Sequence, residues 1–578
     1  MTDPSFIRPA APRTTVQARL PDGRVYEAPP GTSLRDILDA ARHADELPAV
    51  AAILDGRLTE LVMPLFTDAD VGPVTIGDAN GMRIYRRSLV FLLVAAAAEV
   101  FPDGALVIDH AATTAGAYFC SVHGRPPFTQ PELDRIAARM RDIVAADAPI
   151  RKAAYTHEDA IAIFKGRGEH DKARLLVHRT KRGLNLYELR GRLDYLQGYM
   201  VPSTGCLRHF ALHAFPPGFM LQFPHQSRPT ELDAITPYPK LFAVFAEYGR
   251  WLQRLGIESV GVLNDAIVDG RLPEISLVAE ALHEARIARI AGDIAAEHDR
   301  IRVVLIAGPS SSGKTTFSKR LAVQLLVNGV RPYPVGLDNY FLERHLTPRD
   351  ERGEYDYESL RALDVPLFNA HLLSLMRGEP VQLPRYNFRT GLREPGPTVG
   401  LETDNVILVE GIHGLNPELV AGLPPERVYR VYVSALTQLN HDRHNRVSTT
   451  DCRLIRRIVR DATTRGYDAA ETLRRWDSVV AGEKKHIFPF QENSDAVFNS
   501  ALAHELAVLR PLAEPLLLQV RPETSQWLEA NRLLSFLQWV RPAGHDPVPT
   551  NSILREFIGG SVLETFRFEP NGRFARAD

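Results

Sequence analysis

Hydrophobic positions change their spacing along the chain, and these changes divide the sequence into segments. Between residues 301 and 505, short apolar runs alternate with stretches of helical spacing; the runs are IRVVLIAG at 301–308, NVILVEG at 405–411 and RVYRVYVSA at 427–435. Buried strands that alternate with helices are typical of a parallel sheet covered by helices on both faces. The pattern therefore predicts a doubly wound α/β domain over residues 301–505.

The segments on either side have other patterns. Residues 14–78 begin with two alternating apolar runs around PDG, a hairpin signal, and continue with TSLRDILDAA, a helix capped by its Thr or Ser. We expect a small α/β domain there, followed by an α+β domain at 79–230. A helical linker is expected at 231–300 and a helical C-terminal segment at 506–578. The predicted fold class is thus α/β multidomain.

Composition places the chain among ordinary soluble globular proteins. Of its 578 residues, 45% are hydrophobic and 24% are charged, and the net charge of −2 gives no basic excess that would indicate nucleic-acid binding. The three scattered cysteines argue against a disulfide framework and for a reducing compartment. The longest apolar run, at 89–98, is too short to span a bilayer, and no secretory signal is visible. We therefore expect a cytoplasmic protein without a membrane partner.

The stretch GPSSSGKTT at 308–316 carries the clearest chemical signal. It matches G-x-x-x-x-G-K-[ST], in which the glycines let backbone N–H groups point at phosphates. Lys314 would neutralise the β- and γ-phosphates, and the Thr315 hydroxyl would bind Mg²⁺. The absence of an N-K-x-D-like guanine motif favours ATP. We predict that ATP contacts the whole loop, namely Gly308, Pro309, Ser310, Ser311, Ser312, Gly313, Lys314, Thr315 and Thr316.

Two carboxylates follow apolar runs and are expected beside this loop. Asp338 follows RPYPVGL, and Glu410 ends NVILVE. Ligands of doubly wound sheets bind at the carboxyl ends of the strands, so both side chains should face the phosphate loop. One can take a proton from an incoming hydroxyl, and the other can hold Mg²⁺ through water.

An arginine-rich stretch, CRLIRRIVRDATTRGYD, offers Arg453, Arg456, Arg457, Arg460 and Arg465. The first four fall on one face of a helix. Such a stripe is usually a solvated face, but next to a phosphate loop it predicts a lid that neutralises the transferred phosphoryl group.

These motifs, taken in order, resemble those of a known family. GPSSSGKTT, LDNYF, YDYESL, LPRYNF, VILVEGIHGL and RLIRRIVRDATTRGYD are similar to the uridine kinase (uridine–cytidine kinase) branch of P-loop kinases, with phosphoribulokinase and pantothenate kinase as relatives. The resemblance covers about 200 residues and implies a P-loop kinase fold.

The resemblance also implies roles for particular residues. Asp338 would be the general base toward a ribose 5′-hydroxyl, Asp356 would hold ribose hydroxyls, and Tyr386 and Arg453 would contact the nucleoside. The residues expected to carry catalysis are Asp338, Lys314, Arg456 and Arg457, and those expected at the Mg²⁺ site are Thr315 and Glu410.

Two positions depart from the family pattern. The family's pocket histidine is replaced by Gly391, and a family glutamine falls near Arg475. Because both positions touch the nucleoside in the family, these departures concern the choice of acceptor rather than phosphoryl transfer itself.

The N-terminal half resembles a second family. ARLPDGRVYEAPPGTSLRDILDAA is similar to a TGS domain, and the following 150 residues resemble the zinc-type editing domain of threonyl-tRNA synthetase. The two histidine positions of that site carry Arg87 and Phe91, and CLRH supplies only Cys206 and His209. Two ligands one helical turn apart are therefore missing, so we predict no zinc and no editing. The histidine pair at 441 and 444 is expected at the surface.

The leading hypothesis is an ATP- and Mg²⁺-dependent kinase that phosphorylates the 5′-hydroxyl of a nucleoside, uridine or cytidine. One alternative is the same chemistry on another hydroxyl, such as that of another nucleoside or of a sugar phosphate. A second is an RNA-binding regulator with an ATP switch, suggested by the basic stretch at 178–192. We also expect a homo-oligomer.

Overall fold

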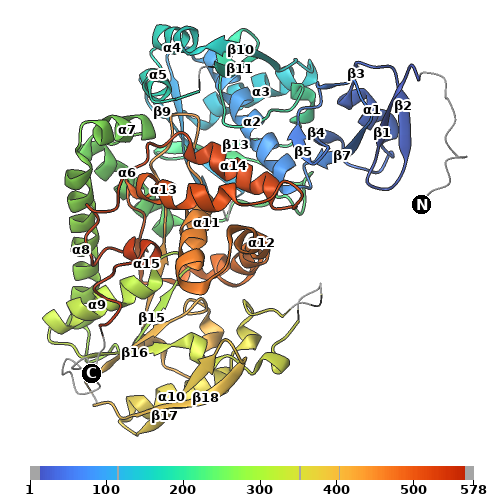
Figure 1. Ribbon diagram of the computed structural model, residues 1–578. Helices are drawn as coiled ribbons and strands as arrows, with labels where there is room; N and C mark the ends of the chain where they lie inside the picture. The colour runs from blue at the N-terminus through green and yellow to red at the C-terminus, as the bar shows by residue number, and fades with distance from the viewer. Residues whose placement is uncertain are drawn as a thin grey trace, which may run out of the picture. The chain divides into compact units, whose positions relative to one another are not determined.

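The structure, a computed structural model, describes residues 13–112, 116–181, 183–349, 353, 355–402 and 404–566 (Figure 1). The chain divides into two compact units. The first contains the described residues up to Thr236 together with Arg443–Asn445, and the second contains the remaining described residues from Pro237 onward. No helix in these described ranges is long and apolar enough to cross a membrane.

The first unit begins with a five-stranded sheet in the order β2-β1-β7-β4-β5. The expected antiparallel hairpin is confirmed: its turn contains Gly23, whose φ of 89° glycine adopts without steric cost. Helix α1 (Leu34–Ala41) begins after Ser33, whose hydroxyl accepts a hydrogen bond from the backbone N–H of Asp36. The strands are β1 (Val16–Arg19), β2 (Val25–Ala28), β3 (Thr32–Ser33), β4 (Ala49–Leu54), β5 (Arg57–Thr59), β6 (Pro64–Leu65) and β7 (Ala69–Thr75).

The rest of the first unit is built around the long helix α2 (Ala79–Val100). Each residue from Leu89 to Ala97 is at most 4% exposed, so the apolar run is the centre of a protein core. Two antiparallel sheets, β13-β14-β9-β8 and β10-β11-β12, complete this part. Their strands are β8 (Ala105–Ala112), β9 (Ala117–His123), β10 (Arg151–Thr156), β11 (Gly183–Leu189), β12 (Arg192–Asp194), β13 (Ala211–Phe215) and β14 (Gly218–Gln222), and the helices are α3 (Gln130–Ala145), α4 (His157–Gly166) and α5 (His170–Val177).

The second unit contains the parallel sheet that the sequence predicted. Five parallel strands pair in the order β16-β19-β15-β20-β21. The connections from β15 to β16 and from β16 to β19 run in opposite directions, so right-handed crossovers place α9 and α10 on opposite faces. The elements are β15 (Val303–Ala307), α9 (Lys314–Val327), β16 (Pro332–Gly336), α10 (Val365–Met376), β19 (Val406–Glu410), β20 (Val428–Ser434) and β21 (Ala496–Asn499).

Helices precede and follow this sheet, and one hairpin extends from it. The sequence analysis did not predict the antiparallel pair β17 (Val381–Asn387) and β18 (Leu392–Val399). Among the described residues, helices lie between Pro239 and Ala296 before the sheet and between Glu505 and Ile558 after it. The helices are α6 (Pro239–Leu255), α7 (Val260–Val268), α8 (Leu272–Ala296), α11 (Thr449–Arg460), α12 (Ala469–His486), α13 (Glu505–Leu518), α14 (Trp527–Leu537) and α15 (Arg555–Ile558).

Candidate functional site

The phosphate-binding loop joins the central strand β15 to the first residue of α9. A Cβ atom on Gly308 would lie 1.9 Å from the carbonyl oxygen of Val433, and one on Gly313 would lie 2.4 Å from Ile553 Cγ2. Gly313 also has a φ of 85°. Both loop glycines are therefore required by close packing, and Gly313 additionally by its left-handed backbone.

Thr315 and Glu410 lie in contact at the start of α9. The Thr315 hydroxyl is 3.0 and 3.2 Å from the two carboxylate oxygens of Glu410. Burial raises the pKa of Glu410 to about 7; the charge of Lys314 opposes this rise, and those of Asp338 and Glu556 add to it. A hydroxyl beside a carboxylate that lacks a full counter-charge is an oxygen donor set of the type that Mg²⁺ prefers, so these two residues fit the metal.

Asp338 lies in a short 3₁₀ turn, Leu337–Tyr340, that directly follows β16. Gly336 at the end of β16 pairs with Glu410, so the two predicted carboxylates end neighbouring strands. The Asp338 side chain is exposed at the surface, yet the protein around it removes enough solvent to raise its pKa, against the charges of Lys314 and Arg465. The structure thus brings together Lys314, Thr315, Asp338 and Glu410.

A further carboxylate that the sequence analysis did not single out lies near Asp338. Burial raises the pKa of Glu358 to about 7, and the charges of Glu483 and Asp338 add to this rise while Arg457 and Lys314 oppose it. Glu358 stands in the quoted motif YDYESL, so the signal was present but was assigned only to Asp356.

The two residues expected at the acceptor lie in local structure of different kinds. Asp356 is half-buried, and one of its carboxylate oxygens accepts the backbone N–H of Glu358 at 3.2 Å. Tyr386 on β17 is 5% exposed and packs against Phe341 and Phe388, with ring centroids 5.6 and 5.0 Å away. Its hydroxyl is buried without a hydrogen-bond partner, so a polar group of an acceptor could satisfy it.

The arginine stripe on α11 faces protein rather than solvent. Arg453 is 2% exposed, and its guanidinium contacts both carboxylate oxygens of Glu483, at 2.6 and 2.7 Å, and the Ser310 carbonyl at 3.0 Å. A fully buried arginine, Arg456, forms an ion pair with Glu505.

The third arginine of this stripe, Arg457, contacts the loop through a side chain. Its guanidinium donates to the Ser310 hydroxyl at 2.8 Å. Arg453 and Arg456 thus contact loop carbonyls while paired with buried carboxylates, whereas Arg457 contacts a loop side chain and shares the carboxylate of Asp461 with Arg460 and Arg465. The role of Arg453 at a nucleoside remains a prediction, because its guanidinium is already paired.

Two backbone amides of the phosphate loop are bound by carboxylates that sequence reasoning missed. The Ser310 N–H donates to Glu483 at 2.8 Å, and the Thr316 N–H and hydroxyl donate to Glu556 at 3.1 and 3.0 Å. Glu483 is on α12 and Glu556 is on α15, far along the chain from the loop, and no local motif marks either residue.

The two departures from the family pattern have different structural settings. Gly391 has a φ of 73°, and a Cβ atom there would lie 2.8 Å from the Arg344 side chain, so Arg344 fills the space next to this position. The Arg344 guanidinium also donates to the Phe388 carbonyl at 2.8 Å. Arg475 is 46% exposed, pairs with Glu471 and lies 4.5 Å from the Tyr467 ring centroid, as a solvated helix residue does.

The zinc-site positions of the first unit hold other contacts. The Arg87 guanidinium donates to the Tyr199 carbonyl at 2.6 Å, and Phe91 is fully buried. Cys206 is partly buried, and burial raises the pKa of its thiol to about 11. Within the described ranges, no three His, Cys, Asp or Glu side chains gather as a metal site would require.

The expectation that the histidine pair at 441 and 444 lies at the surface is wrong. His441 is fully buried beside Phe536, with ring centroids 5.1 Å apart, and burial lowers its pKa to about 4. His444 is 5% exposed, and its Nδ1 lies 2.8 Å from Asp194, which also contacts Lys172 at 2.9 Å. Charge partners distant in sequence, which no local pattern reveals, account for the burial of His444.

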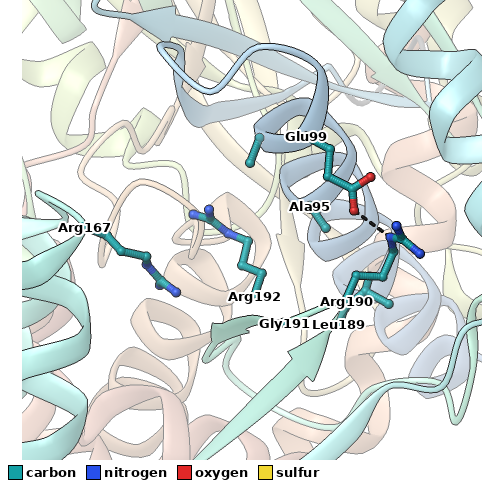
Figure 2. Close-up of a pocket in the computed structure, with 8 residues that line it drawn as sticks. Ala95, Glu99, Arg167, Leu189, Arg190, Gly191 and Arg192 are labelled. Carbon is teal, nitrogen blue, oxygen red and sulfur yellow. Dashed lines mark hydrogen bonds and ion pairs between the residues drawn. The ribbon is translucent and has the colours of Figure 1, made fainter.

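A pocket of about 280 Å³ lies in the first unit (Figure 2). Ala95, Ala98 and Leu189 give it apolar walls. Three arginines also line it, but Arg190 pairs with Glu99 at 2.6 Å, and Arg167 and Arg192 pair with Glu169 at 2.7 and 2.5 Å. Of the basic stretch in the sequence analysis, Arg190 and Arg192 are therefore held in ion pairs within the protein, as surface arginines commonly are.

Comparison with known proteins supports a composite chain. Residues 303–507 match the family model described as phosphoribulokinase / uridine kinase family. The N-terminal half is similar to threonine–tRNA ligases: 32% identity over 194 residues in Hyphomonas neptunium and 33% over 195 residues in Rhodospirillum rubrum, 33% of this chain in each case. The chain spans 29% and 30% of the lengths of those two relatives.

A solved structure reported as a “possible uridine kinase” from Bacillus stearothermophilus is also similar. It matches 37% of this chain and 98% of that protein, at 19% identity and a TM-score of 0.27, a score from which we draw no argument. The site and its fold rest instead on the family match and on the geometry above. Residues 303–507 thus match the model of the phosphoribulokinase / uridine kinase family, and the N-terminal half of the same chain is similar to part of threonine–tRNA ligases.

Proposed function

We propose that the chain transfers the γ-phosphoryl group of ATP to the 5′-hydroxyl of a nucleoside, uridine or cytidine. The observation that carries this proposal is the position of Asp338, which follows β16 beside Glu410 and within the field of Lys314. A carboxylate that is solvent-accessible, next to a phosphate loop and raised in pKa suits a general base toward an incoming hydroxyl.

In this mechanism the chain positions charges and moves one proton. Lys314 and the loop amides hold the phosphates, and Arg457 approaches the loop through Ser310. The acceptor oxygen bonds to the γ-phosphorus as the bond from that phosphorus to the bridging oxygen breaks, ADP leaves, and the hydroxyl proton passes to Asp338. Mg²⁺, held by Thr315 and Glu410, would neutralise phosphate charge.

The test is a phosphoryl-transfer assay with γ-labelled ATP and a panel of acceptors. The panel contains uridine, cytidine, purine nucleosides, pantothenate and ribulose 5-phosphate. The variant is Asp338→Asn, and the matched control is Asp299→Asn, at a side chain that is 97% exposed. Label on uridine or cytidine that Asp338→Asn abolishes supports the proposal; label on no acceptor contradicts it.

An anionic acceptor is the second candidate, and Arg344 favours it. This arginine occupies the space beside Gly391, so the chain has a guanidinium next to a position that carries no side chain. Arginine binds phosphates and carboxylates through paired hydrogen bonds. If the panel labels ribulose 5-phosphate but no nucleoside, and Arg344→Met raises KM for that acceptor, this candidate replaces the first.

The RNA-linked alternative rests on the similarity of the N-terminal half to threonine–tRNA ligases. It requires RNA retention that weakens steeply with salt. Passage of tRNA through a column of immobilised protein at low salt without retention would remove this alternative.

A further inference from the structure

At the N-terminus of α9, within the proposed nucleotide site, a carboxylate of the protein itself accepts hydrogen bonds. The first hydrogen bond inside this helix runs from the Phe317 N–H to the Gly313 carbonyl, at 3.0 Å. The amides before Phe317 therefore have no partner within the helix, and they are the groups that a helix N-terminus presents to an anion. One of these amides, the Thr316 N–H, already donates a hydrogen bond to an anionic group.

That anion is the carboxylate of Glu556. A single oxygen, Oε2, accepts both the Thr316 N–H at 3.1 Å and the Thr316 hydroxyl at 3.0 Å. Within the described residues Glu556 has no ion-pair partner, so its negative charge is balanced chiefly by the end of α9. A nucleotide phosphate bound to the same amides would need the same donors and would be repelled by the same charge.

Glu483, the second carboxylate on the loop, differs in just this respect. Arg453 neutralises it through two hydrogen bonds at 2.6 and 2.7 Å, and Glu483 is fully buried. It therefore belongs to the fixed frame of the loop, whereas Glu556 is half-exposed and, within the described residues, is bound by the end of α9 without an ion-pair partner.

The backbone that carries Glu556 is held firmly. Ile553, Leu554 and Phe557 are fully buried, Ile553 packs against Gly313, and the Arg456 guanidinium lies 5.0 Å from the Phe557 ring centroid. Removing the whole segment from the loop would expose all of these apolar side chains. Rotation of the Glu556 side chain alone is the smaller change, since glutamate has three rotatable side-chain bonds and its head is not enclosed.

We propose that Glu556 is an internal anion that occupies the Thr316 amide and hydroxyl in the nucleotide-free protein and that ATP displaces it. This inference rests on the proposed nucleotide site. The affinity for ATP is then set by a competition within the chain, with Glu556 as the competitor and the rest of the C-terminal segment as its fixed support.

The first experiment measures ATP binding by calorimetry, without an acceptor, for the wild-type chain and for Glu556→Gln. Glutamine keeps an oxygen for Thr316 but removes the charge, so we expect the Kd for ATP to fall about tenfold. The matched control is Glu523→Gln, at an exposed glutamate in the same C-terminal region, for which no change in Kd is expected.

The second experiment uses the unaltered chain and so does not depend on how the variant folds. Carbodiimide-promoted amidation with a small amine marks accessible carboxylates, and mass spectrometry reads each site. We expect the labelling of Glu556 to rise when ATP and Mg²⁺ are added, while that of Glu523 stays constant.

Each other outcome overturns the inference in a recognisable way. Equal Kd values for wild type and Glu556→Gln, with unchanged labelling, would leave the nucleotide site in place and make Glu556 a helix cap only. A weaker Kd in Glu556→Gln would make it a residue that supports ATP binding. ATP binding to neither protein would remove the proposed function together with the inference.

Discussion

Buried carboxylates have pKa values shifted in opposite directions in the two units of this chain. In the first unit, Asp194 lies between Lys172 and His444, and their charges hold its pKa well below its ordinary value despite the opposing effect of burial. In the kinase-family region, burial raises the pKa of Glu410 and of Glu358 to about 7, because the nearby cations do not balance them.

This difference separates charges that serve the fold from charges that await a ligand. A buried carboxylate that contacts both a lysine and a histidine, as Asp194 does, already has its partners within the fold. Neighbouring carboxylates with raised pKa values repel one another, and binding a metal ion or accepting a proton relieves this repulsion. The comparison therefore supports the proposed site in the second unit, and substitutions in the two sets of charges are expected to have different consequences.

The largest expected effect is on the kinase side. Asp338→Asn should lower kcat by about 10²–10⁴-fold with little change in ATP affinity, because the acceptor proton loses its receiving group. Steady-state kinetics with the acceptor found by the panel measures this, beside Asp299→Asn. Activity equal to wild type would show that Asp338 is not the base. It would also contradict the assignment of the unbalanced carboxylates of the second unit to catalysis.

The next effect is structural and belongs to the first unit. Lys172→Met should destabilise this unit by about 3–5 kcal/mol, because Asp194 remains buried without its lysine partner. Hydrogen exchange of the β11 and β12 amides measures the free energy of opening, and Lys165→Met, at an exposed lysine on α4, is the control. A loss similar to that of the control would mean that Asp194 does not depend on Lys172.

A pH profile sharpens the comparison on the kinase side. A base with a raised pKa becomes protonated as the pH falls, so kcat/KM should drop about tenfold for each pH unit on the acid side of its pKa. The midpoint of this drop should lie above the ordinary pKa of aspartate. The profile is measured between about pH 5 and pH 9. If Glu410 governs this limb, added Mg²⁺ should move the midpoint down, because cation and proton compete for one carboxylate; if Asp338 governs it, the midpoint should stay.

The stability of the nucleotide-free protein gives a related, smaller effect with a fixed sign. Because the pKa of Glu410 is about 7 when folded and 4.5 in its ordinary state, this group favours the folded chain less as the pH rises through that window. Glu410→Gln should therefore raise the melting temperature more at the upper end of the window than at the lower end. An equal shift at both ends would mean that Glu410 ionises as freely as in the unfolded chain.

The smallest effect is expected at the paired arginines of the pocket in Figure 2. Arg190 and Glu99 are 39% and 30% exposed, and pairs of this kind contribute about 0–1 kcal/mol. Arg190→Gln should therefore change the free energy of opening measured at β11 by less than about 1 kcal/mol. A loss as large as that of Lys172→Met would place this pair among the buried charges of the first unit.

Local patterns predicted the parts of the site that depend on local sequence. The run before Gly308 gives a strand, the glycine spacing gives the loop, and the ends of two further runs give Asp338 and Glu410. Each needs only the rule that parallel strands end at the same edge of a sheet.

Contacts made over long sequence separations could not be predicted in the same way. Glu483 reaches the loop across 173 residues and Glu556 across 240, and nothing in their own surroundings marks them as partners. For the same reason the sequence predicted that the arginines of α11 form a solvated stripe or a lid. The carboxylates that pair with Arg453 and Arg456 lie on other helices.

Arg443–Asn445 lie inside the family-matched region, yet they are counted in the first compact unit. The Arg443 guanidinium forms an ion pair with Asp171, and the Gln197 N–H donates to the Asn445 side-chain oxygen at 2.9 Å. The boundary between the compact units therefore does not coincide with the boundary of the family match. A fragment cut at the start of the family match would therefore leave Arg443 and Asn445 without the groups that bind them here.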